Sequence, residues 1–359
     1  MKKKKVYLTL QNGVSFQGYA FGAEGEITGE LVFSTGMVGY VETLTDPSNY
    51  GKIVVQTFPL IGNYGVMRAD MESKKAWVSA YVVREYCEEP SNFRTEEKLD
   101  AFLKEEGVVG VYGIDTRNLT KILREEGEMN ARISNKPLNA EEIAMLSTYK
   151  TEDPASAVMT NSQTWGEKTS RYTLAFWNFG GKKSTINRFV AQDCYVIDVP
   201  STTTAEELLA LNVDGVVISD GPGDPVTYTD SIEELKKLLG KKPVFGIGLG
   251  HQLTALAFGA KTKKQKYGHR GSNQPVKSAI DGRVYISTQN HGYTVIPETI
   301  KEGVISFTSV NDGSCEGIDY QSYKAFTVQF APESCDNGNV ENPLYKKFFA
   351  MIEKEKENA

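Results

Sequence analysis

The sequence of 359 residues has few of the groups that carry redox, metal or imidazole chemistry: it contains four cysteines and only three histidines. Cys87, Cys194, Cys315 and Cys335 form no Cys-x-x-Cys pair, so neither a zinc site nor a disulfide framework is indicated, and we expect reduced thiols and no metal. No hydrophobic run approaches the roughly 18 residues that a membrane-spanning helix needs. These absences predict a cytoplasmic protein without a membrane segment.

The chain also lacks an excess of positive charge. It contains 40 Lys and Arg and 46 Asp and Glu, which gives a net charge of −6. Because binding to nucleic acid requires a basic surface that neutralises phosphates, no nucleic-acid partner is expected. The three histidines, His251, His269 and His291, all lie within one stretch of the second half, which limits where imidazole chemistry could occur.

The length predicts two domains. Residues 1–150 mix short alternating apolar segments with Gly, Asp and Pro, which is typical of a mixed, β-rich domain. Helical spacing appears there twice, over 99–107 and over 116–127. Residues 151–170 are polar and interrupted by Pro154, and we expect them to be the linker.

Residues 171–359 have a different pattern, in which short apolar strands alternate with helices. This alternation predicts a doubly wound α/β domain, a parallel sheet covered by helices, with binding residues at the carboxyl ends of its strands. The strands are expected at 172–177, 195–199, 213–219 and 244–247, and the helices at 183–191, 205–211, 231–239 and 343–354.

The segment Ser-Asp-Gly-Pro-Gly-Asp-Pro at 219–225 follows one of these strands. Gly221 and Gly223 let backbone N–H groups approach a ligand, and the prolines stiffen the loop, so the segment could bind an oxyanion or a carboxylate. A plain turn would use the same residues, and the pattern alone does not separate the two.

The segment Val-Phe-Gly-Ile-Gly-Leu-Gly-His-Gln-Leu at 244–253 has the order strand, sharp turn, helix. That is the arrangement of a nucleophile elbow, which presents a reactive side chain above a sheet. Gly248 stands where a serine or cysteine is expected. A phosphate-binding turn is the alternative, but His251 occupies the place of the third glycine of the dinucleotide fingerprint.

Two further segments offer polar groups near strand ends. Gln-Asn-His-Gly-Tyr at 289–293 supplies an amide, an imidazole and backbone groups, and Thr-Val-Gln-Phe-Ala-Pro-Glu at 327–333 is a strand that runs into a turn with an acid. Taken singly, each segment is compatible with a structural role as well as a catalytic one.

Together these segments resemble the small subunit of carbamoyl phosphate synthetase. In the first domain the resemblance rests on Phe-Ser-Thr-Gly-Met-Val-Gly-Tyr at 33–40, Pro-Leu-Ile-Gly-Asn-Tyr-Gly at 59–65 and Gly-Ile-Asp-Thr-Arg at 113–117. The second domain is similar to class I glutamine amidotransferases of flavodoxin-like fold. The resemblance implies a large-subunit partner that carries ATP and Mg²⁺, and no cofactor in this chain.

In that family a cysteine at the elbow attacks the glutamine carboxamide, a histidine takes and returns the proton, and a glutamate orients the imidazole. By resemblance Gly248 stands at the cysteine position, Ala331 at the histidine position and Glu333 at the acid position. Since glycine forms no thioester and alanine carries no proton, the resemblance implies a subunit without glutaminase activity.

The groups that hold glutamine in the family are largely retained. Resemblance assigns the backbone N–H groups of Leu249 and Gly223 to the oxyanion hole, a role that requires no side chain. The full set of implied glutamine contacts is Ser48, Gly221, Gly223, Leu249, Gln252, Asn290, Gly292 and Tyr293.

Four functions therefore stand as hypotheses. In the first, a silent amidotransferase subunit supports ammonia-dependent carbamoyl phosphate synthesis by its large subunit. The second and third are a glutamine-binding sensor and a structural scaffold for the large subunit. The fourth is an active glutaminase with a rescued nucleophile such as Cys335, which would need a base that the 327–333 segment no longer supplies. Whether the product feeds arginine or pyrimidine synthesis stays open.

Overall fold

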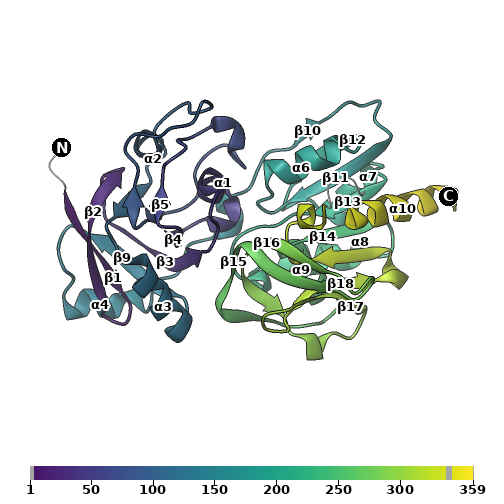
Figure 1. The fold of residues 1–359 in the computed structure, drawn as a ribbon. Helices are drawn as coiled ribbons and strands as arrows, with labels where there is room; N and C mark the ends of the chain where they lie inside the picture. The colour runs from purple at the N-terminus through teal and green to yellow at the C-terminus, as the bar shows by residue number, and fades with distance from the viewer. Residues whose placement is uncertain (1–3, 337–341, 359) are drawn as a thin grey trace. The chain divides into compact units, whose positions relative to one another are not determined.

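A computed structural model describes residues 4–336 and 342–358. The chain divides into two units, Met1–Pro154 and Ala155–Ala359 (Figure 1). Most of the segment expected to be a linker, 151–170, lies in the second of these units. Strand β10 (Gln163–Trp165) lies within it and pairs antiparallel with the second unit's sheet. Two of the three side chains of β10, Gln163 and Thr164, are polar and exposed at the edge of the sheet, so its sequence resembles that of a connection.

The first unit is a closed barrel of seven strands, in the order β1-β2-β8-β6-β4-β3-β9. Both helices expected here are present, and the second begins after the side-chain cap of Asp115 and ends at Gly127. The elements are β1 (Lys5–Leu10), β2 (Ser15–Gly22), β3 (Ile27–Ser34), α1 (Tyr40–Thr45), η1 (Pro47–Asn49), β4 (Lys52–Gln56), β5 (Leu60–Ile61), η2 (Arg68–Asp70), β6 (Ala80–Val82), β7 (Glu85–Tyr86), α2 (Leu99–Glu105), β8 (Val109–Tyr112), α3 (Thr116–Glu126), β9 (Met129–Ser134) and α4 (Ala140–Leu146).

The second unit is built on one sheet of ten strands. Five of them, in the order β12-β11-β13-β14-β19, are mutually parallel. The elements are α5 (Pro154–Ala157), β10, β11 (Tyr172–Asn178), α6 (Lys183–Val190), β12 (Cys194–Pro200), α7 (Ala205–Ala210), β13 (Gly215–Ile218), η3 (Pro225–Thr227), α8 (Thr229–Leu238), β14 (Val244–Ile247), α9 (Leu249–Ala257), β15 (Thr262–Ser278), β16 (Val284–Val295), η4 (Pro297–Thr299), β17 (Val304–Ser309), β18 (Cys315–Tyr320), η5 (Gln321–Tyr323), β19 (Ala325–Val328), η6 (Pro332–Cys335) and α10 (Pro343–Glu357).

Helices cover both faces of the parallel strands, so the predicted doubly wound architecture is confirmed (Figure 1). Successive side chains of a strand point to opposite faces, and β11 shows the result. Ala175 and Trp177 pack with α7, α8 and α9, whereas Leu174 and Phe176 pack with α6 and α10. The carboxyl ends of β13, β14 and β19 meet at one edge, where the candidate residues of this unit lie.

The antiparallel strands β15, β16, β17 and β18 extend the sheet beyond β19 and carry His269 and His291. The four cysteine thiols are free. Among the helices of the described residues, none is long and apolar enough to cross a membrane.

The packing of α9 against β13 predicts the effect of substituting Gly250. An alanine Cβ there would lie 2.4 Å from the backbone oxygen of Ile218, which cannot move without disturbing the sheet. Gly250→Ala should therefore lower the free energy of unfolding by about 1–3 kcal/mol. Urea denaturation measures this change.

The direction of the stability change tests the contact, because alanine in an unobstructed helix is favoured over glycine by about 1 kcal/mol and would stabilise the protein. Lys236→Ala, on the exposed side of α8, is the control and should change stability by no more than about 0.5 kcal/mol. A stabilised Gly250→Ala protein would contradict the close contact.

Candidate functional site

The turn between β14 and α9 has the geometry of the expected elbow. Gly248 joins strand to helix with φ 56° and ψ −110°, and its N–H donates to the carbonyl of Val328 at 2.9 Å. A residue with a side chain is strained at this positive φ, and glycine is not. The elbow thus exists as backbone, but it presents no reactive atom.

The parallel pairing of β14 with β19 brings the 331–333 segment beside the elbow. Ile247 is in register with Val328, and three residues later the N–H of Ala331 donates to the carbonyl of Thr288 at 2.9 Å. The Ala331 position therefore lies at the same edge of the sheet as Gly248, where only a methyl group is offered.

The expected acid is present but faces a different partner. Glu333 lies in η6, and its Oε1 accepts a hydrogen bond of 2.9 Å from the hydroxyl of Tyr345 in α10. This contact joins the 331–333 segment to the C-terminal helix.

Cys335 and His251, the thiol and the imidazole nearest these segments in sequence, both lie in the interior. Cys335 is fully buried, and burial raises the pKa of its thiol to about 12, so the thiolate that would attack glutamine does not form at neutral pH. His251 is also fully buried, its Nδ1 lies 2.8 Å from the hydroxyl of Thr327, and burial lowers its pKa to about 3. Both side chains belong to the interior packing.

An acid that the sequence analysis did not select occupies the N-terminus of α9. The Oδ1 atom of Asp220 accepts hydrogen bonds from the backbone N–H groups of Gly221 at 2.8 Å and Leu249 at 2.9 Å. The sequence analysis paired Leu249 with Gly223, whereas the two N–H groups that converge on Asp220 are those of Leu249 and Gly221. An acid directly before Gly-Pro-Gly at a strand's end was the available signal.

The structure brings Gln252 and Tyr293 together. The amide of Gln252 donates to the Tyr293 carbonyl and to Oε1 of Gln329, both at 2.9 Å, and the side chain is 4% exposed. Asn290 and Gly292 lie beside Tyr293 on β16. The contact ties α9 to β16, and through β16 to the segment that contains Ala331.

Ser48 belongs to the first unit, where it lies in η1. Its side chain is only 2% exposed, and its hydroxyl has no hydrogen-bond partner among the described residues. Since a buried hydroxyl is normally hydrogen-bonded, an unsatisfied one at a position implied to contact glutamine is notable.

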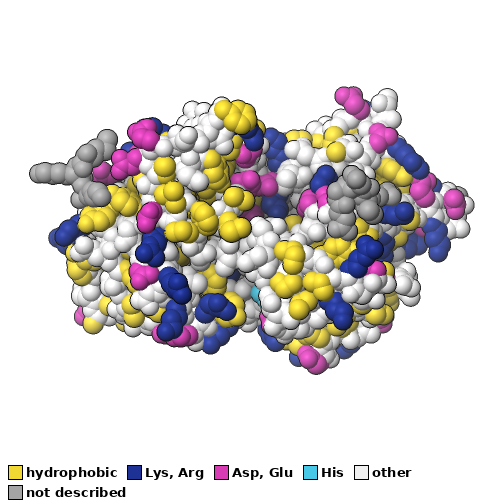
Figure 2. All heavy atoms as spheres, in the orientation of Figure 1, with side chains coloured by type: hydrophobic (Ala, Val, Ile, Leu, Met, Phe, Trp, Pro, Cys, Tyr) yellow, Lys and Arg dark blue, Asp and Glu magenta, His cyan; other side chains and the backbone are white. Residues whose placement is uncertain are grey.

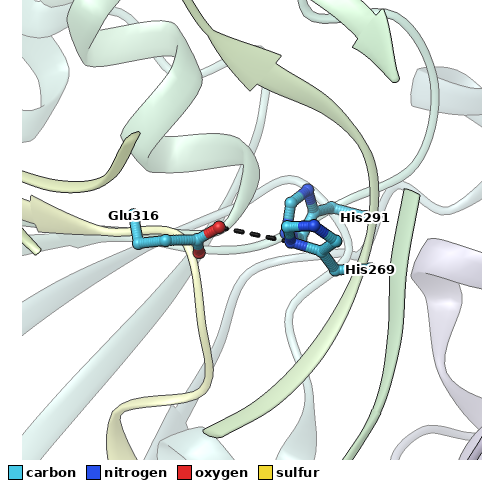
Figure 3. A group of neighbouring side chains, drawn as sticks. All are labelled: His269, His291 and Glu316. Atoms are coloured by element: carbon cyan, nitrogen blue, oxygen red, sulfur yellow. Dashed lines mark ion pairs between the residues drawn. The ribbon is translucent and has the colours of Figure 1, made fainter. Parts of the chain in front are cut away.

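The remaining two histidines form a buried polar cluster (Figure 3). Nε2 of His269 lies 3.0 Å from Asp312 and Nδ1 lies 3.3 Å from Glu316, which is fully buried. Nδ1 of His291 bonds to the Tyr293 carbonyl at 2.8 Å. All three imidazoles in the chain are less than a tenth exposed, and histidine is almost out of sight on the face drawn in Figure 2.

His269, His291 and Glu316 are also the group among the described residues whose side-chain geometry could hold a metal ion. The contacts of His269 with Asp312 and Glu316 are explained by protonation of the His269 imidazole. Burial lowers the pKa of His269, but its hydrogen bonds to Asp312 and Glu316 outweigh burial and raise it to about 9. The same hydrogen bond lowers the pKa of Asp312. A protonated His269 between two carboxylates is the arrangement that these shifts favour.

Comparison with known proteins gives matches to both units. Residues 8–133 match the family "Carbamoyl-phosphate synthase small chain, CPSase domain", and residues 176–351 match "Glutamine amidotransferase class-I". The carbamoyl phosphate synthase small chain of Clostridium perfringens is 46% identical over 96% of this chain and 98% of its own. The small chain of Bacillus thuringiensis is 44% identical over 97% and 96%, and that of Fusobacterium nucleatum 43% over 96% and 98%.

The His269 cluster predicts a pH dependence of stability. Because the folded pKa of His269, about 9, is above the ordinary value of 6.5, its contribution is complete below pH 6.5 and is lost as the pH rises through 9. Removing the cation leaves Glu316 buried without its partner, so His269→Gln should cost about 3 kcal/mol at pH 6.

Urea denaturation between pH 6 and pH 9.5 measures both effects. The difference in stability between wild type and His269→Gln should shrink as the pH rises. Asp281→Asn, which removes an exposed acid beside Arg283, is the control and should leave the slope of wild type unchanged. A constant difference across the range would show that His269 is not charged in the folded protein.

Proposed function

The chain belongs to the carbamoyl-phosphate synthase small-chain family and carries a class I glutamine amidotransferase domain, and on this basis we propose that it is a small subunit without glutaminase activity. In this proposal the large subunit makes carbamoyl phosphate from free ammonia, with ATP and Mg²⁺ bound on that subunit. The complex is expected in the cytoplasm.

The observation that carries this proposal is the pair Gly248 and Ala331. By resemblance, position 248 would supply the nucleophile that forms the thioester, and position 331 the base that protonates the leaving ammonia. Hydrolysis of a carboxamide by this route needs a nucleophile that attacks the carbon and a base that later protonates the leaving ammonia. In subtilisin, loss of the nucleophile or of the base alone lowers kcat by about 10⁶-fold. Within the described residues, Cys335 is protonated and His251 is neutral in the interior, which supports the view that neither replaces these groups.

The intact framework around positions 248 and 331 supports a subunit that still binds a large subunit, rather than one whose domain has lost its structure. The elbow, the loop at Gly221 and the contact between Gln252 and Tyr293 are all formed. The curated relatives are named as small chains, a name that implies a complex with a large subunit, and they match this chain over nearly their whole length.

A glutamine-binding sensor is the second candidate. The observation in its favour is the buried hydroxyl of Ser48, which has no partner among the described residues and stands at an implied glutamine contact. Structural support of the large subunit alone would require neither Ser48 nor Gln252.

Incubation of the purified protein with glutamine, alone and with its large subunit, should release no glutamate above the uncatalysed rate. The same complex should form carbamoyl phosphate when ammonium is supplied with ATP and bicarbonate. Omission of the small subunit shows how much of that activity it supports. Glutamate release at a rate typical of amidotransferases would refute the proposal.

Calorimetry with glutamine, together with co-purification of the large subunit, distinguishes the sensor from the scaffold. If the protein is only a scaffold, Ser48→Ala and Gln252→Ala should co-purify with the large subunit as wild type does. Neither wild type nor either variant should then show a heat of binding with glutamine. Heat from wild type that Ser48→Ala abolishes would instead establish the sensor.

A further inference from the structure

We infer that Asp220 is an internal inhibitor of the amidotransferase domain: its carboxylate fills the oxyanion hole and excludes the carboxamide of glutamine. The inference rests on the proposed loss of glutaminase activity and adds a second reason for it, one that does not depend on the nucleophile or the base.

One oxygen of Asp220 receives two converging N–H groups. In this inference the oxyanion hole consists of Leu249 and Gly221, rather than of Leu249 and Gly223. Gly221 and Leu249 donate to Oδ1 at 2.8 and 2.9 Å from two directions, which is the donor arrangement of an oxyanion hole around its anion. The acceptor here is charged, and it lies at the N-terminus of the nine-residue helix α9, where the helix dipole favours negative charge. A neutral amide oxygen competes poorly for this position.

The position of Asp220 depends on the glycine at 248. A Cβ built on Gly248 would lie 2.3 Å from both Cγ and Oδ1 of Asp220. Real atoms do not approach so closely, so a side chain at position 248 and the observed carboxylate exclude each other. Loss of the nucleophile therefore created the space that Asp220 occupies.

The same contact explains how the helix end remains satisfied without a ligand. The first N–H groups of a helix have no partner within it, and an empty oxyanion hole leaves them to water. Asp220 supplies the acceptor from the neighbouring strand end, because β13 and β14 are paired and the 219–223 loop follows β13. Inhibition and local stability thus arise from one interaction.

Two consequences separate this role from that of an ordinary turn residue. Removing the carboxylate should weaken the folded protein in the absence of ligand, because Gly221 and Leu249 lose a charged acceptor. It should also strengthen glutamine binding by at least tenfold, because the same two N–H groups become available to the carboxamide oxygen. A residue that only shapes the loop would give the first effect and not the second.

The test compares wild type, Asp220→Ala, Asp220→Asn and the control Asp230→Ala, an exposed acid on α8 whose loss changes the net charge equally. Calorimetry and thermal unfolding are run with and without millimolar glutamine. Asp220→Ala should have a lower Tm than wild type without glutamine and a larger upward shift with it. Asp220→Asn keeps an oxygen acceptor without the charge and should fall between the two, while Asp230→Ala should match wild type.

Gly248→Ala is the independent variant, because it leaves Asp220 in the sequence and evicts its carboxylate through the added methyl group. It should bind glutamine at least tenfold more tightly than wild type, without hydrolysing it. An unchanged affinity in both Asp220→Ala and Gly248→Ala would overturn the inference, and so would tight binding of glutamine by wild type. Glutamate release by wild type would refute the proposed function, whereas tight binding without release refutes only the role of Asp220.

Discussion

Strand β14 enters helix α9 through one residue, Gly248, and the arrangement of the whole site depends on that junction. The pairing of β14 with β19 fixes the junction on one side, and the close approach of Gly250 to Ile218 fixes it on the other. Both constraints are made by backbone atoms. They do not require a particular side chain at position 248, so the form of the junction is set by the backbone around it.

Catalytic groups and stability are largely separate in this unit. The interior on both faces of the sheet is aliphatic and aromatic, and Gly248 and Ala331 contribute no side chain to it beyond one methyl group. Acids and bases near the site have acquired structural partners instead. Glu333 bonds to Tyr345, and Asp220 bonds to Gly221 and Leu249. Without these partners the polar groups would be left unsatisfied, a cost that the contacts avoid.

Much of the fold could be predicted from local signals. The apolar strand 244–247 and the helix from Thr116 to Glu126 appear as expected, because hydrophobic spacing, an Asp cap and a terminal Gly each act within a few residues. Strand β10 was missed because it is short and has no local strand pattern, and its backbone is held as a strand by antiparallel pairing with β12. Asp220 was missed for a related reason: its acceptor role exists only where β13 and β14 bring the 219–223 loop to α9. The identity of the glutamine contacts came from family resemblance, since no local rule assigns a substrate to Ser48 or Tyr293.

The topology also limits how this protein can recognise another chain. The seven barrel strands of the first unit close on themselves, and its separate sheet of β5 and β7 has strands of only two residues. In the second unit β17 pairs with both β15 and β18, so the antiparallel end of the sheet is closed as well. Within the described residues, the large sheet is left with β10 as its open edge, a strand of three residues. A partner can add a strand only to an exposed edge of sufficient length. Recognition of another chain by the described residues would therefore rely on side chains and loops rather than on backbone pairing, and the same closure disfavours edge-to-edge pairing between copies of this chain.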